Sequence, residues 1–227
     1  MEMTGSPHNE PADDKTKKQR RRLSSDERRK EFIQKSIKLF AEEGFESSTR
    51  ELARRLEVTQ PLLYRYFPSK QDLIAAVYEE VYLRRWQPEW EALIADRSRP
   101  LADRLIEFYD KYTDAIFHPD WIRIYLYSGL KGVEINTRYM DLVAGKILEP
   151  IITEARAEGG YPSKPASDED LDAVWMVHGG IFYFGVVKLV YENKSPDGKK
   201  AAIAFVVTSM IDGLKRRFEA ETNPPIQ

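Results

Sequence analysis

The sequence contains no cysteine and only three histidines among its 227 residues. Without cysteine there is no disulfide bond and no thiolate ligand, and with so few histidines we expect no metal site. Long apolar runs are also missing, since the two longest, GGIFYFGVV and AAIAFVV, are too short to span a bilayer. The basic N-terminus has no apolar segment behind it, so a signal peptide is not expected. We therefore expect a cytoplasmic protein with no membrane partner.

The motifs of common catalytic sites are missing as well. The sequence has no GxSxG elbow, no Gly-rich phosphate loop, no HExxH pair and no cysteine nucleophile. The acidic triplet Asp168-Glu169-Asp170 is better explained as the first turn of a helix. We expect neither a catalytic residue nor a cofactor, although turnover of a bound small molecule would favour an enzyme.

What the sequence does contain is typical of a globular protein with a sizeable core, being 42% hydrophobic and 32% charged. The net charge of −2 is unevenly placed. Residues 1–85 hold 18 Lys and Arg against 15 Asp and Glu, whereas the remainder of the chain is acidic. This asymmetry favours an anionic partner such as nucleic acid for the first part of the chain.

Apolar residues recur at helical spacing along most of the chain, and no segment alternates with period two over a useful length. The pattern predicts an all-α protein of about nine helices. Capping residues and apolar stripes place the helices near 24–44, 48–57, 59–67, 69–87, 100–117, 121–130, 134–158, 167–191 and 203–218. Pro150 is expected to kink the helix that contains it.

Residues 48–67 predict two short helices joined by a tight turn, which is a helix-turn-helix. A second helix this short fits the major groove of DNA and presents its N-terminal residues to base edges. The residues expected to pack inward are Leu52, Leu56, Val58, Leu62, Leu63 and Phe67, covered by Phe32, Ile33 and Phe40.

The outward residues of this motif suit contacts with DNA. Gln60 can form two hydrogen bonds with adenine, Pro61 can contact a thymine methyl group, and Arg50 can reach guanine or phosphate. Thr59, Tyr64 and Lys70 are expected to contact phosphates, and Lys70 lies at a helix start, which itself attracts anions. The alternative is a structural hairpin on which these side chains are merely solvated.

The segment TRELARRLEVTQPLLYRYFPSKQDL resembles the DNA-binding domain of the TetR (tetracycline repressor) family. The similar segments are Thr49-Arg50, Leu52-Ala53, Leu62 to Tyr64, Tyr66 to Lys70, and Asp72-Leu73. The resemblance adds Thr49 to the candidate DNA contacts. The resemblance covers about residues 27–80. It implies a three-helix DNA-binding domain over residues 23–72 and a larger helical domain over residues 73–227, which binds an effector and dimerises. This sequence departs from the family at Glu57, where glycine is usual; a positive φ there would store about 1 kcal/mol of strain.

Residues 1–22 are polar and are expected to be disordered. Within them, KTKKQRRR holds six basic residues in eight. This segment is either a solubilising tail or an arm that contacts phosphates or the minor groove.

The last two predicted helices carry more apolar surface than one-sided burial needs, and Gly179-Gly180 permits a close backbone approach. The resemblance implies that they form a homodimer through a four-helix bundle, which suits a palindromic operator. The alternative is that they form the core of a monomer.

Aromatic residues cluster in the predicted larger domain, where an effector pocket would be apolar with a few polar groups. Plain core packing is the alternative explanation for most of them. The candidate effector-binding residues are Phe108, Tyr112, Trp121, Tyr125, Trp175, His178 and Phe182.

Taken together, these features predict a ligand-responsive DNA-binding regulator, a repressor that a small-molecule effector releases from its operator. The alternative is an architectural DNA-binding protein without an effector, whose affinity follows salt alone.

Overall fold

The computed structural model describes residues 24–132, 134–193 and 198–222. These residues form helices and connecting segments without any β-strand, which confirms the predicted all-α class. The expected basic arm at residues 1–22 lies outside the described residues. The helices are α1 (Ser25–Glu43), α2 (Thr49–Arg55), α3 (Gln60–Tyr66), α4 (Lys70–Val81), η1 (Leu83–Arg85), α5 (Glu89–Ala95), α6 (Leu101–Ile116), α7 (Pro119–Leu130), α8 (Glu134–Val143), η2 (Ala144–Leu148), α9 (Glu149–Gly159), α10 (Asp168–Leu189) and α11 (Lys199–Thr222).

Five of the described helices begin at capping residues that the sequence predicts. In each case a serine or threonine side chain accepts a hydrogen bond from the backbone N–H three residues later, which satisfies a donor that has no partner inside the helix. These N-cap residues are Ser24, Ser48, Thr59, Ser69 and Ser167. At the other end of α1, Gly44 stops the helix with φ of 73°, a conformation that glycine adopts without strain.

The helix predicted from residue 69 to just before Pro88 is shorter than expected. It ends at Val81, and after the 3₁₀ turn η1 a further helix, α5, starts directly after Pro88. Proline suits a helix start because it has no backbone N–H to leave unsatisfied. The break allows Trp90 of α5 to become buried, with its ring 5.4 Å from that of Trp86.

Where the sequence predicts a kink at Pro150, the structure has a wide, π-helical turn just before the proline. Between α8 and α9, residues Ala144–Leu148 form a π-helical segment, closed by a hydrogen bond from the Glu149 N–H to the Ala144 carbonyl. Pro150 then occupies the first turn of α9. A proline ring inside a continuous helix would clash with the carbonyl four residues earlier, and the wider turn avoids this clash.

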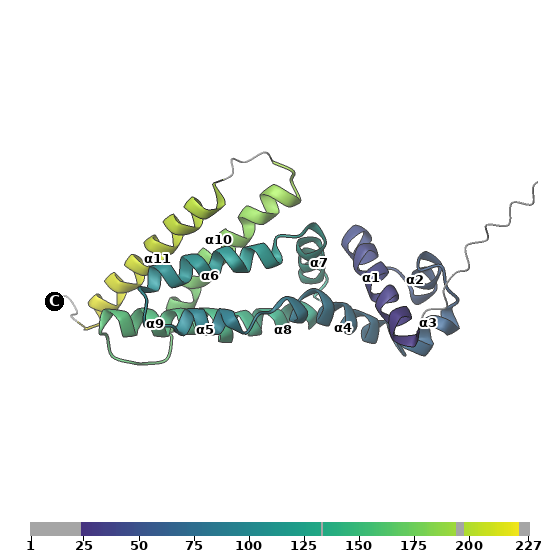
Figure 1. Ribbon diagram of the computed structural model, residues 1–227, viewed down its shortest axis with the longest axis horizontal. Helices are drawn as coiled ribbons and strands as arrows, with labels where there is room; N and C mark the ends of the chain where they lie inside the picture. Colours follow the sequence, from purple (N-terminus) through teal and green to yellow (C-terminus); the bar gives the residue numbers. More distant parts are fainter. Residues whose placement is uncertain (1–23, 133, 194–197, 223–227) are drawn as a thin grey trace, which may run out of the picture.

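The molecule is elongated, with α1, α2 and α3 at one end and the C-terminal half of α11 at the other (Figure 1). Helices α4, α8, α5 and α9 run along one side, while α6, α10 and α11 pack above them. Helix α1 packs against α4 and α7, and these contacts join the three-helix end to the larger helical part. The predicted domain boundary between residues 72 and 73 falls within α4.

Buried charged side chains form ion pairs between α6, α9, α10 and α11, at the end of the molecule far from α1. The guanidinium of Arg104 is 3.1 Å from the Glu154 carboxylate. Asp170 accepts from Arg156 at 3.2 Å and from Arg217 at 2.6 Å. Burial alone would raise the pKa of Asp170, but the hydrogen bonds from Arg217, Ser167 and Arg156 outweigh it and the pKa is lowered. Asp170 therefore both caps α10, as predicted for the acidic triplet, and anchors two arginines.

Candidate nucleic-acid interface

The turn between α2 and α3 has the hydrogen bonds of a Schellman motif. The N–H of Glu57 donates to the Arg54 carbonyl at 3.1 Å, and the N–H of Val58 donates to the Ala53 carbonyl at 2.9 Å. The motif requires a left-handed residue at Glu57, whose φ is 58°. Glu57 therefore has the positive φ for which strain was predicted, and the turn fixes the direction in which α3 leaves α2.

Helix α3 is held by one buried face. Leu63 is buried within α3, and Phe67 is buried at its C-terminal end. Leu52 and Leu56 of α2 are buried in the same core. The Phe32 ring of α1 meets the Tyr66 ring edge to face at 5.2 Å. This packing confirms the predicted inward set, with Val58 and Leu62 only partly buried, and leaves the other face of α3 exposed.

Three of the predicted DNA contacts form one hydrogen-bonded group. The Gln60 side-chain amide donates to the Thr49 hydroxyl at 3.2 Å, and that hydroxyl lies 3.0 Å from the Tyr64 hydroxyl. These hydrogen bonds lower the pKa of Tyr64, mainly through Thr49. The start of α2 and the outer face of α3 are therefore linked by polar side chains that are on the surface.

Three further predicted contacts stand at the helix starts. Arg50 lies in the first turn of α2 and is exposed, as is Pro61 in the first turn of α3. Thr59 uses its hydroxyl to cap α3, accepting from the Leu62 N–H at 3.4 Å. The helix starts thus present an exposed cation, an exposed apolar ring and a capping hydroxyl next to the Gln60 group.

Lys70 is placed differently from the other predicted contacts. Its ammonium donates to the Phe45 backbone carbonyl in the loop between α1 and α2. It also lines a shallow hollow with Thr49 and Tyr64, so it borders the exposed face described above. Partial burial lowers its pKa, while the charge of nearby Glu46 opposes that shift.

One polar group near the motif was not expected from the sequence. Glu51 accepts hydrogen bonds from Arg54 and Arg55, and these bonds lower its pKa to about 2. Arg55 also forms an ion pair of 2.6 Å with Glu43 at the end of α1. The spacings of three and four residues within α2 could have indicated the first two pairs. The link to α1 depends on how the helices pack and has no local sequence signal.

The predicted effector-binding residues form two aromatic groups on α6, α7 and α10. In the first, the Tyr112 ring stacks on Phe108 and lies 5.4 Å from His178, which Trp175 contacts from its own helix. In the second, Trp121 and Tyr125 stack at 5.4 Å, and Phe182 packs against both. Phe108, Tyr112, Trp121 and His178 are buried, and the other three are partly buried.

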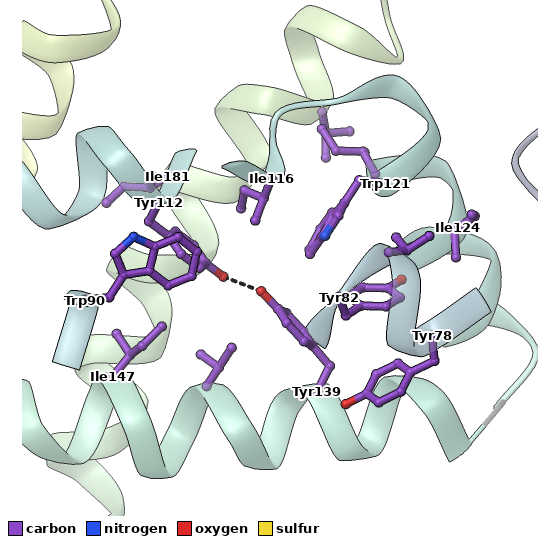
Figure 2. Packing of buried hydrophobic residues seen from close by; sticks show 14 of the residues in the cluster. Tyr78, Tyr82, Trp90, Tyr112, Ile116, Trp121, Ile124, Tyr139, Ile147 and Ile181 are labelled. Carbon is purple, nitrogen blue, oxygen red and sulfur yellow. Dashed lines mark hydrogen bonds between the residues drawn. The ribbon is translucent and has the colours of Figure 1, made fainter. Parts of the chain in front are cut away.

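A residue that the sequence did not single out joins the two groups. The hydroxyl of Tyr139 on α8 lies 2.7 Å from that of Tyr112, and its ring lies 5.4 Å from Trp121 (Figure 2). Trp90 and Tyr82 complete the packing around them. Tyr139, Trp90 and Tyr82 occur at the helical spacing of ordinary core residues. Their position around the two aromatic groups is therefore visible only in the tertiary structure.

Burial keeps the polar atoms of this aromatic core neutral. Burial raises the pKa values of Tyr109, Tyr112 and Tyr139, so their hydroxyls stay protonated. It lowers the pKa of His178 to about 4. The His178 Nδ1 atom lies 3.5 Å from the Tyr109 hydroxyl. The core therefore offers hydroxyl and imidazole hydrogen bonds within an apolar surrounding.

The three-helix end contacts the larger part mainly through α7. The Tyr127 hydroxyl donates to the Glu42 carbonyl at 3.5 Å, and Lys131 forms an ion pair with Glu46. A side chain at Gly44 would lie 3.1 Å from the Tyr127 ring. Helix α7 therefore carries Trp121 and Tyr125 of the aromatic core near one end, and at the other end it contacts the last turn of α1 and the α1–α2 loop.

None of the helices in the described part of the chain combines the length and apolar character needed to cross a bilayer. Within the same residues, no group of three or more His, Asp or Glu side chains is arranged to hold a metal ion.

Comparison with known proteins identifies relatives for both parts of the chain. Residues 32–77 match the family profile described as bacterial regulatory proteins, tetR family. A TetR family transcriptional regulator from Pseudomonas syringae pv. tomato str. DC3000 has a similar structure, with a TM-score of 0.57 at 17% identity over 84% of this chain and 97% of that chain. A TetR-like transcriptional regulator from Rhodococcus sp. RHA1 gives a TM-score of 0.52 at 16% identity, over 89% of this chain and 100% of that chain. A tetR-family transcriptional regulator from Streptomyces coelicolor gives a TM-score of 0.50 at 16% identity, over 89% of this chain and 94% of that chain.

At these identities, the structural likeness shows a shared fold over nearly the whole chain. Among curated protein sequences, none matches this chain.

Proposed function

We propose that this chain is a ligand-responsive repressor of the TetR type that binds a palindromic operator as a homodimer; residues 32–77 match the profile of the tetR family of bacterial regulatory proteins, and the fold is shared with such regulators. The profile match over residues 32–77 and the shared fold support a DNA-binding regulator. The observation that supports the proposal most directly is the exposed face of α3, where Gln60 is held by Thr49 beside Tyr64.

Each exposed group has a role in this proposal. Gln60 reads a base in the major groove, because its amide can donate and accept toward adenine, and Pro61 contacts a thymine methyl group. Arg50 reaches guanine or phosphate. Tyr64, Thr59 and Lys70 contact phosphates and fix the orientation of α3 on the duplex.

The surfaces of α10 and α11 support the homodimer. Met176, Tyr183 and Phe205 are 79%, 55% and 72% exposed, respectively, although each is a large apolar or aromatic side chain. Exposed apolar residues gathered on neighbouring helices indicate a protein interface. A two-fold pairing of these helices would present two copies of α3 to two half-sites of one operator.

The aromatic core on α6, α7, α8 and α10 supports an effector site. Because its hydroxyls and its imidazole are neutral, it suits an apolar, uncharged small molecule with one or two hydrogen-bonding groups. Binding there would favour a position of α7 that alters the contacts of Tyr127 and Lys131 with the α1–α2 loop. The effector would thereby shift the dimer away from the shape that fits DNA. On this account the chain has no catalytic role and acts in the cytoplasm, where the chromosome lies.

A selection of bound duplexes from a random pool, followed by a screen of small molecules for release, tests the proposal. We expect a palindromic consensus, with affinity at least ~10³-fold above that for random DNA. We also expect the selected duplex to be released by one class of apolar compound. An architectural protein would instead enrich no consensus, and its affinity would change with salt alone.

A further inference from the structure

A cleft lies between the DNA-binding helices and the larger helical part, and one of its lining residues, Tyr78, has its ring 5.3 Å from that of Tyr82 at the edge of the aromatic core. Its volume is about 490 Å³, within the range of sites that bind small molecules. Its apolar lining comes from Phe45 of the α1–α2 loop and from Ile74, Ala75 and Tyr78 of α4. The cleft therefore spans the junction through which the two parts of the molecule contact each other.

The charged lining of this cleft has an excess of positive charge. Lys70, Lys131 and Arg138 line it together with two carboxylates, Glu46 and Asp72. Both carboxylates have partners: Glu46 pairs with Lys131, and Asp72 accepts from the Ser69 N–H and hydroxyl at 2.9 and 2.7 Å. Lys70 instead donates to a neutral backbone carbonyl, so its charge is not matched by a carboxylate in contact.

Charges of both signs act on the Tyr78 side of the cleft wall. Burial raises the pKa of the Tyr78 hydroxyl, while Arg138 opposes that shift and Asp141 adds to it. The Lys131–Glu46 pair is on the surface, with the two side chains 48% and 72% exposed. An ion pair that is this exposed is weak, so Lys131 can exchange Glu46 for another anion at little cost in free energy.

We propose that this cleft is a second ligand site, specific for an amphipathic anion, and that a ligand in it competes with DNA for Lys70. The apolar body of the ligand would lie on Phe45, Ile74 and Ala75, and its anionic group would meet Lys131, Arg138 and Lys70. Because Lys70 also borders the hollow shared with Thr49 and Tyr64, its ammonium cannot serve both a ligand and a DNA phosphate. Only the competition between ligand and DNA rests on the proposed function, whereas the ligand site in the cleft does not.

Two dyes that differ by one charged group test the site. 1-Anilinonaphthalene-8-sulfonate has an apolar body and a sulfonate, and N-phenyl-1-naphthylamine has the same body without the sulfonate. Fluorescence titration of the full chain gives the dissociation constant of each dye. Both dyes can also bind exposed apolar surface on α10 and α11, so the assay compares variants rather than absolute affinities.

Two variants of the Lys131–Glu46 ion pair should change the affinity for the sulfonate dye in opposite directions. Lys131→Ala removes a cation and should weaken its binding about fivefold, whereas Glu46→Gln frees Lys131 and should tighten it about twofold. The neutral dye should respond to neither. Lys146→Ala is the matched control, because Lys146 is 50% exposed and pairs with Glu91 outside the cleft. If both variants weaken the sulfonate, or if neither differs from the control, the proposal is overturned.

Filling the cleft gives a second test. Ala75 is exposed on α4 and lines the cleft, so Ala75→Trp should occupy the space and weaken both dyes while the thermal unfolding midpoint is retained. Ala92→Trp, at an exposed position of α5, controls for adding an indole. Unchanged binding of both dyes to Ala75→Trp would contradict the assignment of the cleft as the site.

Competition with DNA is measured separately. The sulfonate titration is repeated with a saturating duplex of mixed sequence, and we expect weaker dye binding by the same factor by which the dye weakens DNA binding. Equal dye affinity with and without bound duplex would overturn the competition for Lys70. A chain that binds the dye as described but no duplex at all would refute the proposed function and leave the site intact.

Discussion

The left-handed turn residue Glu57 allows the helix-turn-helix geometry to be tested by stability alone. Its φ of 58° places a residue with a Cβ atom where glycine is favoured, at a strain of about 1–2 kcal/mol. Glycine would relieve that strain but loses about 0.5–1 kcal/mol more chain entropy on folding. The Glu57 side chain is exposed, and its N–H bond to Arg54 would remain in the variant. Glu57→Gly should therefore stabilise the protein by about 0.5–1 kcal/mol, which corresponds to about 1–4 °C in Tm.

Urea unfolding followed by circular dichroism measures this difference, and Glu57→Ala is the control. Alanine removes the same charge and side chain but keeps the strain, so its stability should stay within about 0.5 kcal/mol of the wild type. A clear loss of stability in Glu57→Gly would refute the reasoning, because it would mean that position 57 does not hold the left-handed turn. Equal gains in both variants would instead assign the effect to the lost charge.

Three further predictions concern the rest of the molecule. The buried, neutral His178 has its pKa lowered from 6.5 to about 4. Between pH 4 and pH 6.5 the unfolded chain therefore binds more protons than the folded chain. About 3 kcal/mol of the free energy of unfolding is lost as the pH falls from 6.5 to 4. In urea unfolding at these two pH values, His178→Phe should not show this loss. Phe205→Glu should convert the dimer to a monomer in light scattering, whereas Leu130→Glu, at an even more exposed apolar residue outside α10 and α11, should not. Gly44→Ala should cost about 1–3 kcal/mol, since it combines a positive φ with a Cβ atom 3.1 Å from the Tyr127 ring; a stability within 0.5 kcal/mol of the wild type would contradict that contact.

Local sequence signals predicted the helix-turn-helix end of the molecule well. Ser48, Thr59 and Ser69 cap the three helices that they were expected to begin. Leu52 and Phe67 are buried as their spacing predicts. These features succeed because caps, turns and apolar stripes act over three or four residues. The roles of the outward residues in contacting DNA remain predictions.

The features that the sequence did not predict depend on contacts between distant segments. Helix α5 was missed because Trp90 is buried against Phe108 and Tyr112 of α6, and nothing local distinguishes it from an exposed residue. Tyr139 was missed for the same reason, since its partner Tyr112 lies 27 residues away. The pairing of Lys131 with Glu46 likewise follows from how α7 meets the α1–α2 loop.

Base reading by α3 through Gln60 can be tested with one set of affinities. The affinities of the wild type and of Gln60→Ala are measured for a selected operator and for every single-base variant of one half-site at a fixed salt concentration. We predict that Gln60→Ala loses about 1–3 kcal/mol on the preferred operator and flattens the preference at one position. Lys70→Ala should instead weaken all sequences about equally. If Gln60→Ala leaves the ranking of the operators unchanged, α3 does not read DNA through this residue.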